Sequence, residues 1–300
     1  MINYTIKNLD NSNVNEFKEY CKAHRKEHDE SFLYDEDLDE FKIGNENPTC
    51  LLYGDKGVEG VCSIIQDEYH LKGKRARVRI FHCSSNRTDD YRLLFDNINS
   101  LNEKVEKIIM FVPIRNTISR NIIEEMGFVI ERFSYIMERT GMEPLDYSFP
   151  DGYELTDYIA GRDEEDYMHV RNIAFSTLRG SEVPLTKEQV ISSMKPEKIL
   201  KGGAKILRYY GSPVGIIRVE HEVEQGKDYT FVAPLAILPE HQGKGLGSNM
   251  LRAGIKTGFD NGYTDSMLTV NVENENALKL YFKEGFKATC EVACYNLKIR

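Results

Sequence analysis

The segment HQGKGLGSNM (241–250) carries three glycines within five positions, between an apolar run and a new apolar periodicity. The run LAIL (235–238) predicts a strand that enters a loop, and LGSNMLRAGIKTGF (246–259) predicts a helix that leaves it. Free backbone N–H groups at a helix start, together with the helix dipole, form a site for phosphate or diphosphate. Glycines would allow positive φ and close approach of the ligand, and Lys244 would add a cation. Taken alone, the loop is equally consistent with a plain tight turn into a helix.

The spacing of the glycines excludes two other phosphate-binding loops. A P-loop needs GxxxxGK[ST], and no lysine followed by Ser or Thr closes this loop. A dinucleotide fingerprint needs GxGxxG early in a βαβ unit, whereas the spacing here is GxGxG, late in a mostly antiparallel order of predicted strands.

Two motifs in sequence order resemble those of the GCN5-related N-acetyltransferases (GNAT). The first is Q-x-x-G-x-G at Gln242–Gly247, which resembles the acetyl-CoA-binding motif of the family. The second resembles the family signature N-x-x-A-x-x-L-Y-x-x-x-G-F and is matched by Asn274, Ala277, Leu280, Tyr281, Gly285 and Phe286. The resemblance covers 152–300 well and 1–140 as a degenerate copy. The chain is thus similar to the tandem two-domain type, with a layout like that of mycothiol synthase.

The resemblance implies where acetyl-CoA would bind. The diphosphate would sit on backbone N–H groups of the loop, and the pantetheine arm would pair like an added strand with a splayed edge near Leu235–Ile237. Asn274 is expected to cap its helix and to be a possible cofactor contact, and Asn276 would reach the pantetheine. The expected cofactor contacts are Leu235, Ala236, Ile237, Gln242, Gly243, Lys244, Gly245, Leu246, Gly247, Ser248, Asn274 and Asn276.

The catalytic residue that the resemblance indicates is Tyr281, as the general acid. Its hydroxyl, with an ordinary pKa near 10, stays protonated at neutral pH and can donate to the departing thiolate. The alternative is a core tyrosine whose hydroxyl is satisfied by the protein. No general base is assigned, because Glu220 and Glu222 are equally well interpreted as solvated hairpin residues. The connection STLRGSEVPLTKEQV (176–190) is expected to build the acceptor site.

The resemblance therefore implies an acyl-CoA N-acyltransferase, which moves an acetyl or other acyl group from acetyl-CoA to a primary amine by direct attack. The partner would be a small-molecule amine, and no metal is expected. A non-catalytic acyl-CoA-binding sensor or interaction module is the alternative; the presence of Tyr281 in one half favours catalysis. A nucleotide-phosphate binder is a third hypothesis, and the second motif argues against it.

The two halves of the chain predict the same order of elements around these motifs. In each half a short strand (4–9 and 153–159) leads into an amphipathic helix (15–25 and 164–175), and three strands follow. These strands are expected at 50–54, 59–66 and 75–82 in the first half and at 204–210, 214–220 and 229–238 in the second. Each half then closes with helix, strand, helix and strand.

The closing parts can be superposed without a gap at a constant offset of 158 residues, which places Asn116 on Asn274 and Gly127 on Gly285. An internal duplication explains this register. The copies differ at the proposed site. Ser84, Arg87 and Asp89 stand where the second half has Gln242, Gly245 and Gly247, and Ile123 stands at the position of Tyr281. We therefore expect the first half to bind no CoA.

These elements predict an α+β (mixed α/β) chain of two tandem domains, each a mostly antiparallel mixed sheet flanked by helices. The resemblance implies that both domains are GNAT-like and that a splayed strand pair lies at the CoA site. The expected boundaries are 1–140 for the degenerate domain, 141–151 for a linker that follows a change of pattern, and 152–300 for the catalytic domain.

Composition limits the partners and the compartment. The chain has 300 residues, 41% hydrophobic residues and a net charge of −9, which argues against a nucleic-acid partner. No apolar stretch is long enough to predict a membrane span. The scattered cysteines favour reduced, buried thiols in a cytoplasmic protein, and a homodimer is a possible oligomeric state. The acidic stretch 27–40 is interpreted as a solvated surface turn.

Overall fold

The computed structural model describes residues 4–98, 101–141, 143–224 and 226–299. The chain divides into two compact units, the first comprising Met1–Ser134 with Cys290–Arg300 and the second comprising Tyr135–Thr289. Each unit is built on a mixed sheet flanked by helices, so the predicted fold class is confirmed.

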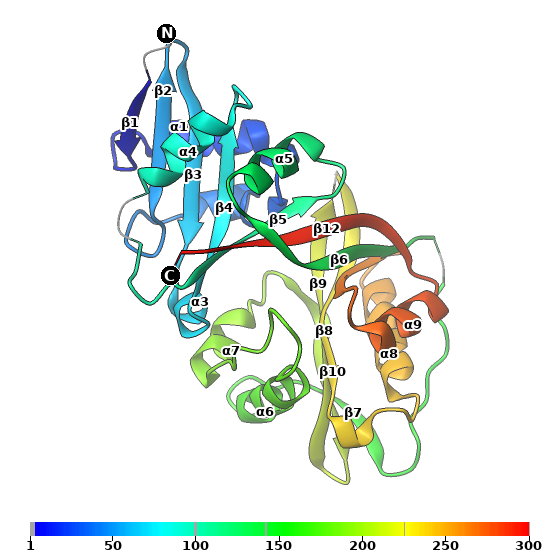
Figure 1. Ribbon diagram of the computed structural model, residues 1–300. Coiled ribbons are helices and arrows are strands. Elements are labelled where there is room, and N and C mark those ends of the chain that lie inside the picture. Colours follow the sequence, from blue (N-terminus) through cyan, green and yellow to red (C-terminus); the bar gives the residue numbers. More distant parts are fainter. Residues whose placement is uncertain (1–3, 99–100, 142, 225, 300) are drawn as a thin grey trace. The chain divides into compact units, whose positions relative to one another are not determined.

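The sheet of the first unit has the strand order β1-β2-β3-β4-β5-β12 (Figure 1). All neighbours pair antiparallel except β4 and β5, which are parallel. Its strands are β1 (Thr5–Asn8), β2 (Thr49–Gly54), β3 (Gly57–Ile65), β4 (Arg75–Cys83), β5 (Lys107–Pro113) and β12 (Lys287–Lys298). Its helices are α1 (Val14–His24), η1 (Arg25–Glu27), η2 (Glu30–Phe32), α2 (Asp35–Asp39), α3 (Glu68–Lys72), α4 (Thr88–Asp96) and α5 (Thr117–Glu125).

The sheet of the second unit has the order β6-β11-β10-β9-β8-β7. The pair β10 and β11 is parallel, whereas β7, β8, β9 and β10 pair antiparallel in succession. Its strands are β6 (Val129–Arg139), β7 (Tyr153–Asp157), β8 (Ile199–Tyr209), β9 (Ser212–Glu224), β10 (Lys227–Ile237) and β11 (Ser266–Asn271). Its helices are α6 (Glu164–Ala174), α7 (Lys187–Ser193), η3 (Pro239–His241), α8 (Leu246–Asp260) and α9 (Glu275–Lys283).

In the second unit, α6 and α7 lie on one face of the sheet, and α8 and α9 lie on the other (Figure 1). Ile217 of β9 faces α8, because a Cβ added to Gly254 of that helix would lie 2.6 Å from its side chain. Arg218, the next residue, points to the opposite face, where its guanidinium donates to the backbone oxygen and hydroxyl of Ser193 at the end of α7. This alternation gives the sheet one face for each helical layer.

The sixth strand of each sheet comes from the other half of the sequence. In the first unit, β12 pairs with β5 from Val292 opposite Pro113 to Lys298 opposite Lys107. In the second unit, which begins at Tyr135 within β6, that strand neighbours β11. The predicted segments 1–140 and 152–300 differ from the two units in this exchange of closing strands. The order of elements along the sequence does not reveal this exchange, because β6 and β12 are each the last strand of their own half of the sequence.

The offset between the copies is 158 residues after the glycine loop and smaller before it. Helices α5 and α9 match in both bounds and in their N-caps, Asn116 and Asn274. In the parallel strand pairs, however, Ala76 stands opposite Ile108 and Thr230 opposite Ser266, an offset of 154 for β4 and β10. The connection from β10 to α8 is therefore four residues longer than that from β4 to α4, and the longer loop contains η3.

Two expectations from composition are met within the described part of the chain. All six cysteines are free, and all but Cys290 are buried. No described helix combines the length and the apolar character that crossing a membrane requires.

The acidic stretch 27–40 is more than the solvated turn that we expected. Leu33 and Leu38 are fully buried in a core shared with Phe17 of α1. Apolar residues spaced among the acids hold η2 and α2 against the sheet, and the net charge of the stretch hides this pattern.

Candidate active site

The loop between β10 and α8 adopts a conformation that needs glycine at two positions. Gly243 and Gly245 have φ of 75° and 76°, in the left-handed region that other residues adopt at a cost. No atom lies within 4 Å of the place where a Cβ would stand at either residue. The backbone of the loop is therefore open to an approaching ligand.

The side chain of Gln242 fixes the entry to the loop. Its amide nitrogen donates to the backbone oxygen of Ile237, the last residue of β10, at 2.9 Å. This hydrogen bond turns the chain back over the end of the strand. The role explains why glutamine suits a position that is otherwise exposed to solvent.

The start of α8 offers free backbone donors. Gly245 is its N-cap residue and has no side chain with which to cap the helix. The first helical bond runs from Asn249 N–H to Gly245 O, so the N–H groups of Leu246, Gly247 and Ser248 have no acceptor within the helix. A 15-residue helix with an uncapped N-terminus attracts anions through these donors and its dipole.

Gly247 does not adopt the positive φ that we expected of the loop glycines. Its backbone is helical, and a Cβ at this position would lie 2.8 Å from Cδ1 of Leu280 in α9. The missing side chain therefore lets α8 pack closely on α9, the helix that carries Tyr281. The third glycine of the loop motif therefore allows this contact between helices, and its backbone does not have the positive φ that favours glycine.

Lys244 supplies a cation at the loop. Its Nζ donates to the backbone oxygen of Glu240 at 3.1 Å and lies 3.5 Å from the hydroxyl of Tyr153. Among the described residues no carboxylate pairs with it, so its charge is free to meet an anion.

The strands β10 and β11 part beside this loop, as predicted. They pair only at Thr230 with Ser266 and at Phe231 with Met267. Between Val232 and Leu235 the strand β10 advances three residues while β9 advances two, so β10 carries a bulge. A bulge bends its strand, and this one turns β10 away from β11.

Beyond the bulge, Leu235, Ala236 and Ile237 pair with β9 on one side only. Their other edge, on the side of β11, pairs with no described strand. The predicted free edge near Leu235–Ile237 is therefore present, and it runs directly into the glycine loop.

Tyr281 lies on α9 with its ring half-buried against the core of the second unit and 6.0 Å from the ring of Phe286. Within the described part of the chain its hydroxyl makes no hydrogen bond, unlike that of a satisfied core tyrosine. Burial raises the pKa of Tyr281 to about 12, so the hydroxyl is protonated throughout the neutral range and can donate to a ligand.

The two asparagines of the second motif have different environments. The side chain of Asn274 accepts a hydrogen bond from Ala277 N–H at 3.3 Å, so the predicted helix cap is confirmed. Asn276 is exposed in the first turn of α9.

Glu220 and Glu222, for which a solvated hairpin position was one of the two interpretations left open, are both partly buried. Glu220 is 16% exposed and forms an ion pair with Arg218, Nε to Oε1, at 2.6 Å. Arg218 Nε also donates at 3.1 Å to the backbone oxygen of Ala233, inside the bulge of β10. Burial raises the pKa of Glu222, which stands opposite Tyr229, farther along β10 from the bulge. Glu220 is thus the carboxylate nearer to the splay.

The expected acceptor segment 176–190 lies against the end of β11. Asn271, the last residue of that strand, donates to the backbone oxygen of Arg179 at 2.9 Å, and the guanidinium of Arg179 is 3.6 Å from Glu273. At the other end of the segment, Thr186 begins α7 with a capping box. The segment therefore borders the side of the splay formed by β11.

An aromatic cluster beside the loop was not predicted. The ring of Tyr153 lies 4.5 Å from that of Tyr209, and its hydroxyl is 2.8 Å from Nδ1 of His241. Tyr210, 77% exposed, packs on Tyr209 at the end of β8. The adjacent tyrosines before Gly211 were the one signal in the sequence. Exposed aromatic faces beside Lys244 suit a planar base linked to a phosphate.

An ion pair holds α8 and α9 together. Arg252 of α8 makes two hydrogen bonds to Glu284 at the end of α9, Nε to Oε2 at 2.7 Å and Nη2 to Oε1 at 3.0 Å. The Glu284 side chain is 1% exposed. This clamp sets the distance between the glycine loop and Tyr281.

We expect Glu284→Ala to lower the free energy of unfolding by about 3 kcal/mol, because it leaves Arg252 without its buried partner. Urea unfolding measures the change. Lys256→Ala, which removes an exposed pair with Asp260 in the same helix, is the control and should cost less than about 0.5 kcal/mol. Equal effects of the two substitutions would contradict the clamp.

The first unit has the same splayed strands and bulge as the second, but its helix start carries charged side chains in place of the glycines. Its strands β4 and β5 pair only from Arg75 to Arg77, and β4 has its own bulge between Val78 and Ile80. The N-cap of α4 is Arg87, and Asp89 and Asp90 fill its first turn. The structure thus aligns Arg87 with Gly245 as predicted, and the carboxylates stand where an anion would bind.

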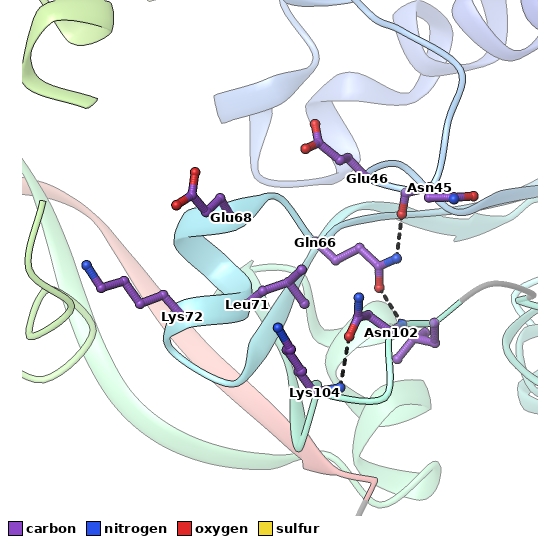
Figure 2. Close-up of a pocket in the computed structure, with 9 residues that line it drawn as sticks. Asn45, Glu46, Gln66, Glu68, Leu71, Lys72, Asn102 and Lys104 are labelled. Carbon is purple, nitrogen blue, oxygen red and sulfur yellow. Dashed lines mark hydrogen bonds between the residues drawn. The ribbon is translucent and has the colours of Figure 1, made fainter. Parts of the chain in front are cut away.

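A separate cavity of about 710 Å³ lies in the first unit (Figure 2). The amide of Gln66 crosses it, donating to Asn45 O and accepting from Asn102 N–H. The cavity is lined by Asn45, Glu46, Gln66, Glu68, Leu71, Lys72, Leu101, Asn102 and Lys104. It contains none of the predicted site residues.

Comparison with known proteins agrees with this geometry. Residues 181–286 match the model of the Acetyltransferase (GNAT) family. The GCN5-related N-acetyltransferase of Sphaerobacter thermophilus superposes with a TM-score of 0.72 at 16% identity, covering 99% of this chain and 96% of that one. A tandem GNAT protein from the clavulanic acid biosynthesis pathway gives 0.72 at 12% identity, covering 99% and 98%. The match to the GNAT family thus lies within the second unit, and the chain has the fold of tandem GNAT proteins.

Among curated proteins, the chain is similar to mycothiol acetyltransferases. That of Paenarthrobacter aurescens (strain TC1) is 31% identical over 157 residues, which are 50% of this chain and 47% of the relative. That of Kocuria rhizophila is 26% identical over 186 residues, 56% of this chain and 58% of the relative. The chain spans about half the length of the curated relatives that it matches.

Proposed function

We propose that the second unit binds acetyl-CoA and transfers its acetyl group to a primary amine by direct attack. One observation carries the proposal: the free edge of β10 beyond its bulge leads without interruption into an uncapped helix N-terminus. An extended ligand that ends in a diphosphate fits this combination, because the edge offers strand-like hydrogen bonds and the helix offers an anion site.

In this proposal the diphosphate binds the backbone N–H groups of the loop and of the first turn of α8. Lys244 adds a positive charge within reach of the same groups. The aromatic faces of Tyr209 and Tyr210 would lie beside the base. Gly243 and Gly245 keep the approach free of side chains.

The pantetheine arm would pair with the free edge at Leu235–Ile237. Backbone N–H groups at the bulge would also polarise the thioester carbonyl as negative charge develops on its oxygen. Arg218 supports this arrangement, because its hydrogen bond to Ala233 O holds the bulge from the opposite side of the sheet.

The transfer forms a C–N bond and breaks the C–S bond of the thioester. The amine, which attacks in its neutral form, loses a proton, and the sulfur leaves as a thiolate that must gain one. Tyr281 has a protonated, unpaired hydroxyl with which to donate to that sulfur. Because the pKa of about 12 exceeds that of an ordinary thiol, the hydroxyl acts first as a hydrogen-bond donor to the developing charge.

The acceptor would enter over the segment 176–190, which borders the β11 side of the splay. The curated relatives are named mycothiol acetyltransferases, so their acceptor belongs in any panel of amines that is tested. The unpaired hydroxyl of Tyr281 favours an enzyme over a binding module, since a sensor has no leaving group to protonate.

We expect one acetyl-CoA per chain, bound by the second unit, because the first unit has Arg87, Asp89 and Asp90 at the equivalent helix start. Isothermal titration with acetyl-CoA, CoA, ATP and NAD measures the number of binding sites and shows which of these ligands binds most tightly. Two sites per chain would contradict the loss of binding by the first unit. Equal affinity for ATP and acetyl-CoA would contradict the proposal that the strand edge binds pantetheine.

A further inference from the structure

A cluster of histidines in the first unit takes no part in the site described above. His24 ends α1, Glu27 lies in η1 and His82 lies near the end of β4. Each offers one ligand atom, and these three atoms lie within 4.8 Å of one another. Nε2 of His82 is 2.8 Å from Oε2 of Glu27, and Nδ1 of His24 is 2.9 Å from Oε1. Two imidazoles and one carboxylate thus converge on one small volume.

The spacing of these atoms suits a tetrahedral metal ion. Zinc takes nitrogen and oxygen ligands at about 2.0–2.2 Å, which places neighbouring ligand atoms about 3.3 Å apart. The two histidine–glutamate distances are shorter than this, and all three ligand atoms lie within 4.8 Å of one another, so side-chain shifts on the order of an ångström would admit the ion. The exposed fraction of the side chain rises from 4% for His82 through 25% for His24 to 51% for Glu27, so the cluster is buried at His82 and open to solvent at Glu27.

The surroundings of His82 orient the ring as an outer hydrogen-bond partner does at a metal site. The hydroxyl of Tyr20 lies 2.7 Å from Nδ1 of His82 and 3.0 Å from the backbone oxygen of Glu59. When the hydroxyl donates to that carbonyl, which can only accept, Nδ1 carries the ring proton and donates to Tyr20. Nε2 then turns a lone pair toward Glu27, and a cation between the two acceptors removes their repulsion.

A third histidine beside the cluster is an independent sign of a ligand. His28 is 6% exposed, and its Nε2 is buried without a hydrogen-bond partner among the described residues. Its ring stands edge-on to that of His82, with centroids 5.7 Å apart. A buried polar atom left unpaired is unfavourable, and a bound ion with its water would supply the missing partner.

Among the residues that the structure describes, the second unit has no such cluster at the equivalent place. The matching strand offset of 154 puts Ala236 at the position of His82. The N-caps of α1 and α6, Asn13 and Asp163, give an offset of 150, which puts Ala174 at the position of His24. The first unit therefore carries ligand-type side chains where the second unit has small apolar ones.

We propose that His24, Glu27 and His82 bind one zinc ion, with a fourth coordination position open to solvent or to a small ligand. Imidazole nitrogens favour zinc over magnesium and calcium, which prefer all-oxygen sites. Three protein ligands and an open position are typical of zinc sites that bind a water or a substrate. The inference does not depend on acetyl transfer by the second unit.

The test uses the full chain after treatment with a chelator and removal of that chelator. Zinc is titrated in competition with a chromogenic chelator, and Co²⁺ is added separately as a spectroscopic probe of tetrahedral coordination. We expect one zinc per chain and a visible Co²⁺ absorption of tetrahedral intensity. His24→Ala and Glu27→Gln should each weaken zinc binding at least about 100-fold, and Tyr20→Phe about 10-fold.

The matched control is His221→Ala, which breaks an exposed histidine–carboxylate pair with Asp228, at 2.7 Å, in the second unit. It should leave zinc affinity unchanged. His24 and Glu27 are partly exposed, so their variants should fold, and circular dichroism verifies this. No stoichiometric binding by the wild-type chain would overturn the proposal, as would binding that survives both ligand substitutions.

Discussion

Replacing Tyr281 by phenylalanine should lower kcat by about 10²–10⁴-fold, with little change in the affinity for acetyl-CoA. General acid catalysis by a positioned side chain contributes about this factor. The hydroxyl makes no hydrogen bond to the described residues, so its loss should cost little folding free energy. Steady-state kinetics with acetyl-CoA and an amine, together with titration of acetyl-CoA, separate the two effects.

The control for this variant is Tyr263→Phe, which removes a hydroxyl from another half-buried tyrosine of the same unit. It should leave kcat within about twofold of the wild type. Because burial raises the pKa of Tyr281 to about 12, the proton is bound at every lower pH. Loss of the Tyr281 proton should therefore not lower the rate at any pH up to about 10. An unchanged kcat in Tyr281→Phe would refute the assignment.

Substituting Gly245 with aspartate should raise the Kd for acetyl-CoA about 100-fold or more. The change places a carboxylate at the N-cap of α8, where the diphosphate would bind, and at about 4 Å such repulsion costs several kcal/mol in a partly buried site. The variant also imitates the first unit, where charged residues fill the start of α4.

Gly245→Asn is the matched control, because asparagine has the same shape and tolerates positive φ about as well as aspartate. It should weaken binding much less, and the ratio of the two Kd values isolates the charge. Both variants should unfold at similar temperatures. Equal loss of affinity in the two variants would mean that strain in the loop, and not the anion site, governs binding.

The helices and strands that carry the site were predictable because their patterns are local. The alternation in VGIIRVE and the helical spacing after Gly245 placed β9 and α8 within a few residues. Asn274 was predicted as a cap because its side chain acts on the next turn of its own helix. The matching bounds of α5 and α9 followed from a gapless register in the sequence.

What the sequence did not predict depends on contacts between distant segments. The role of Gly247 requires Leu280 in another helix, and the burial of Glu220 requires Arg218 together with two helices above the sheet. The exchange of β6 and β12 cannot be predicted from local sequence patterns, because the two strands are equivalent and each would fit either sheet. The histidine cluster joins Glu27 of an acidic stretch to His82 on a strand, and net charge alone made that stretch look solvated.

The extra length of the β10–α8 loop was hidden for a similar reason. A single offset of 158 aligned the second motif and the helix starts, so it also seemed to align the strands before them. Only the pairing of Ala76 and Thr230 with their parallel neighbours reveals the offset of 154. The four added residues bring η3 and His241 beside Tyr153, and they lengthen the connection that contains the glycine loop.

The central claim is tested most directly by measuring amine-dependent release of the CoA thiol from acetyl-CoA by the wild-type chain. A panel of primary amines that includes the acceptor of the mycothiol acetyltransferases is incubated with the protein, and mass spectrometry follows the amine. We predict that at least one amine accelerates thiol release and gains an acetyl group in equal amount. Tight binding of acetyl-CoA without amine-dependent release across the panel would contradict the account and indicate an acyl-CoA sensor.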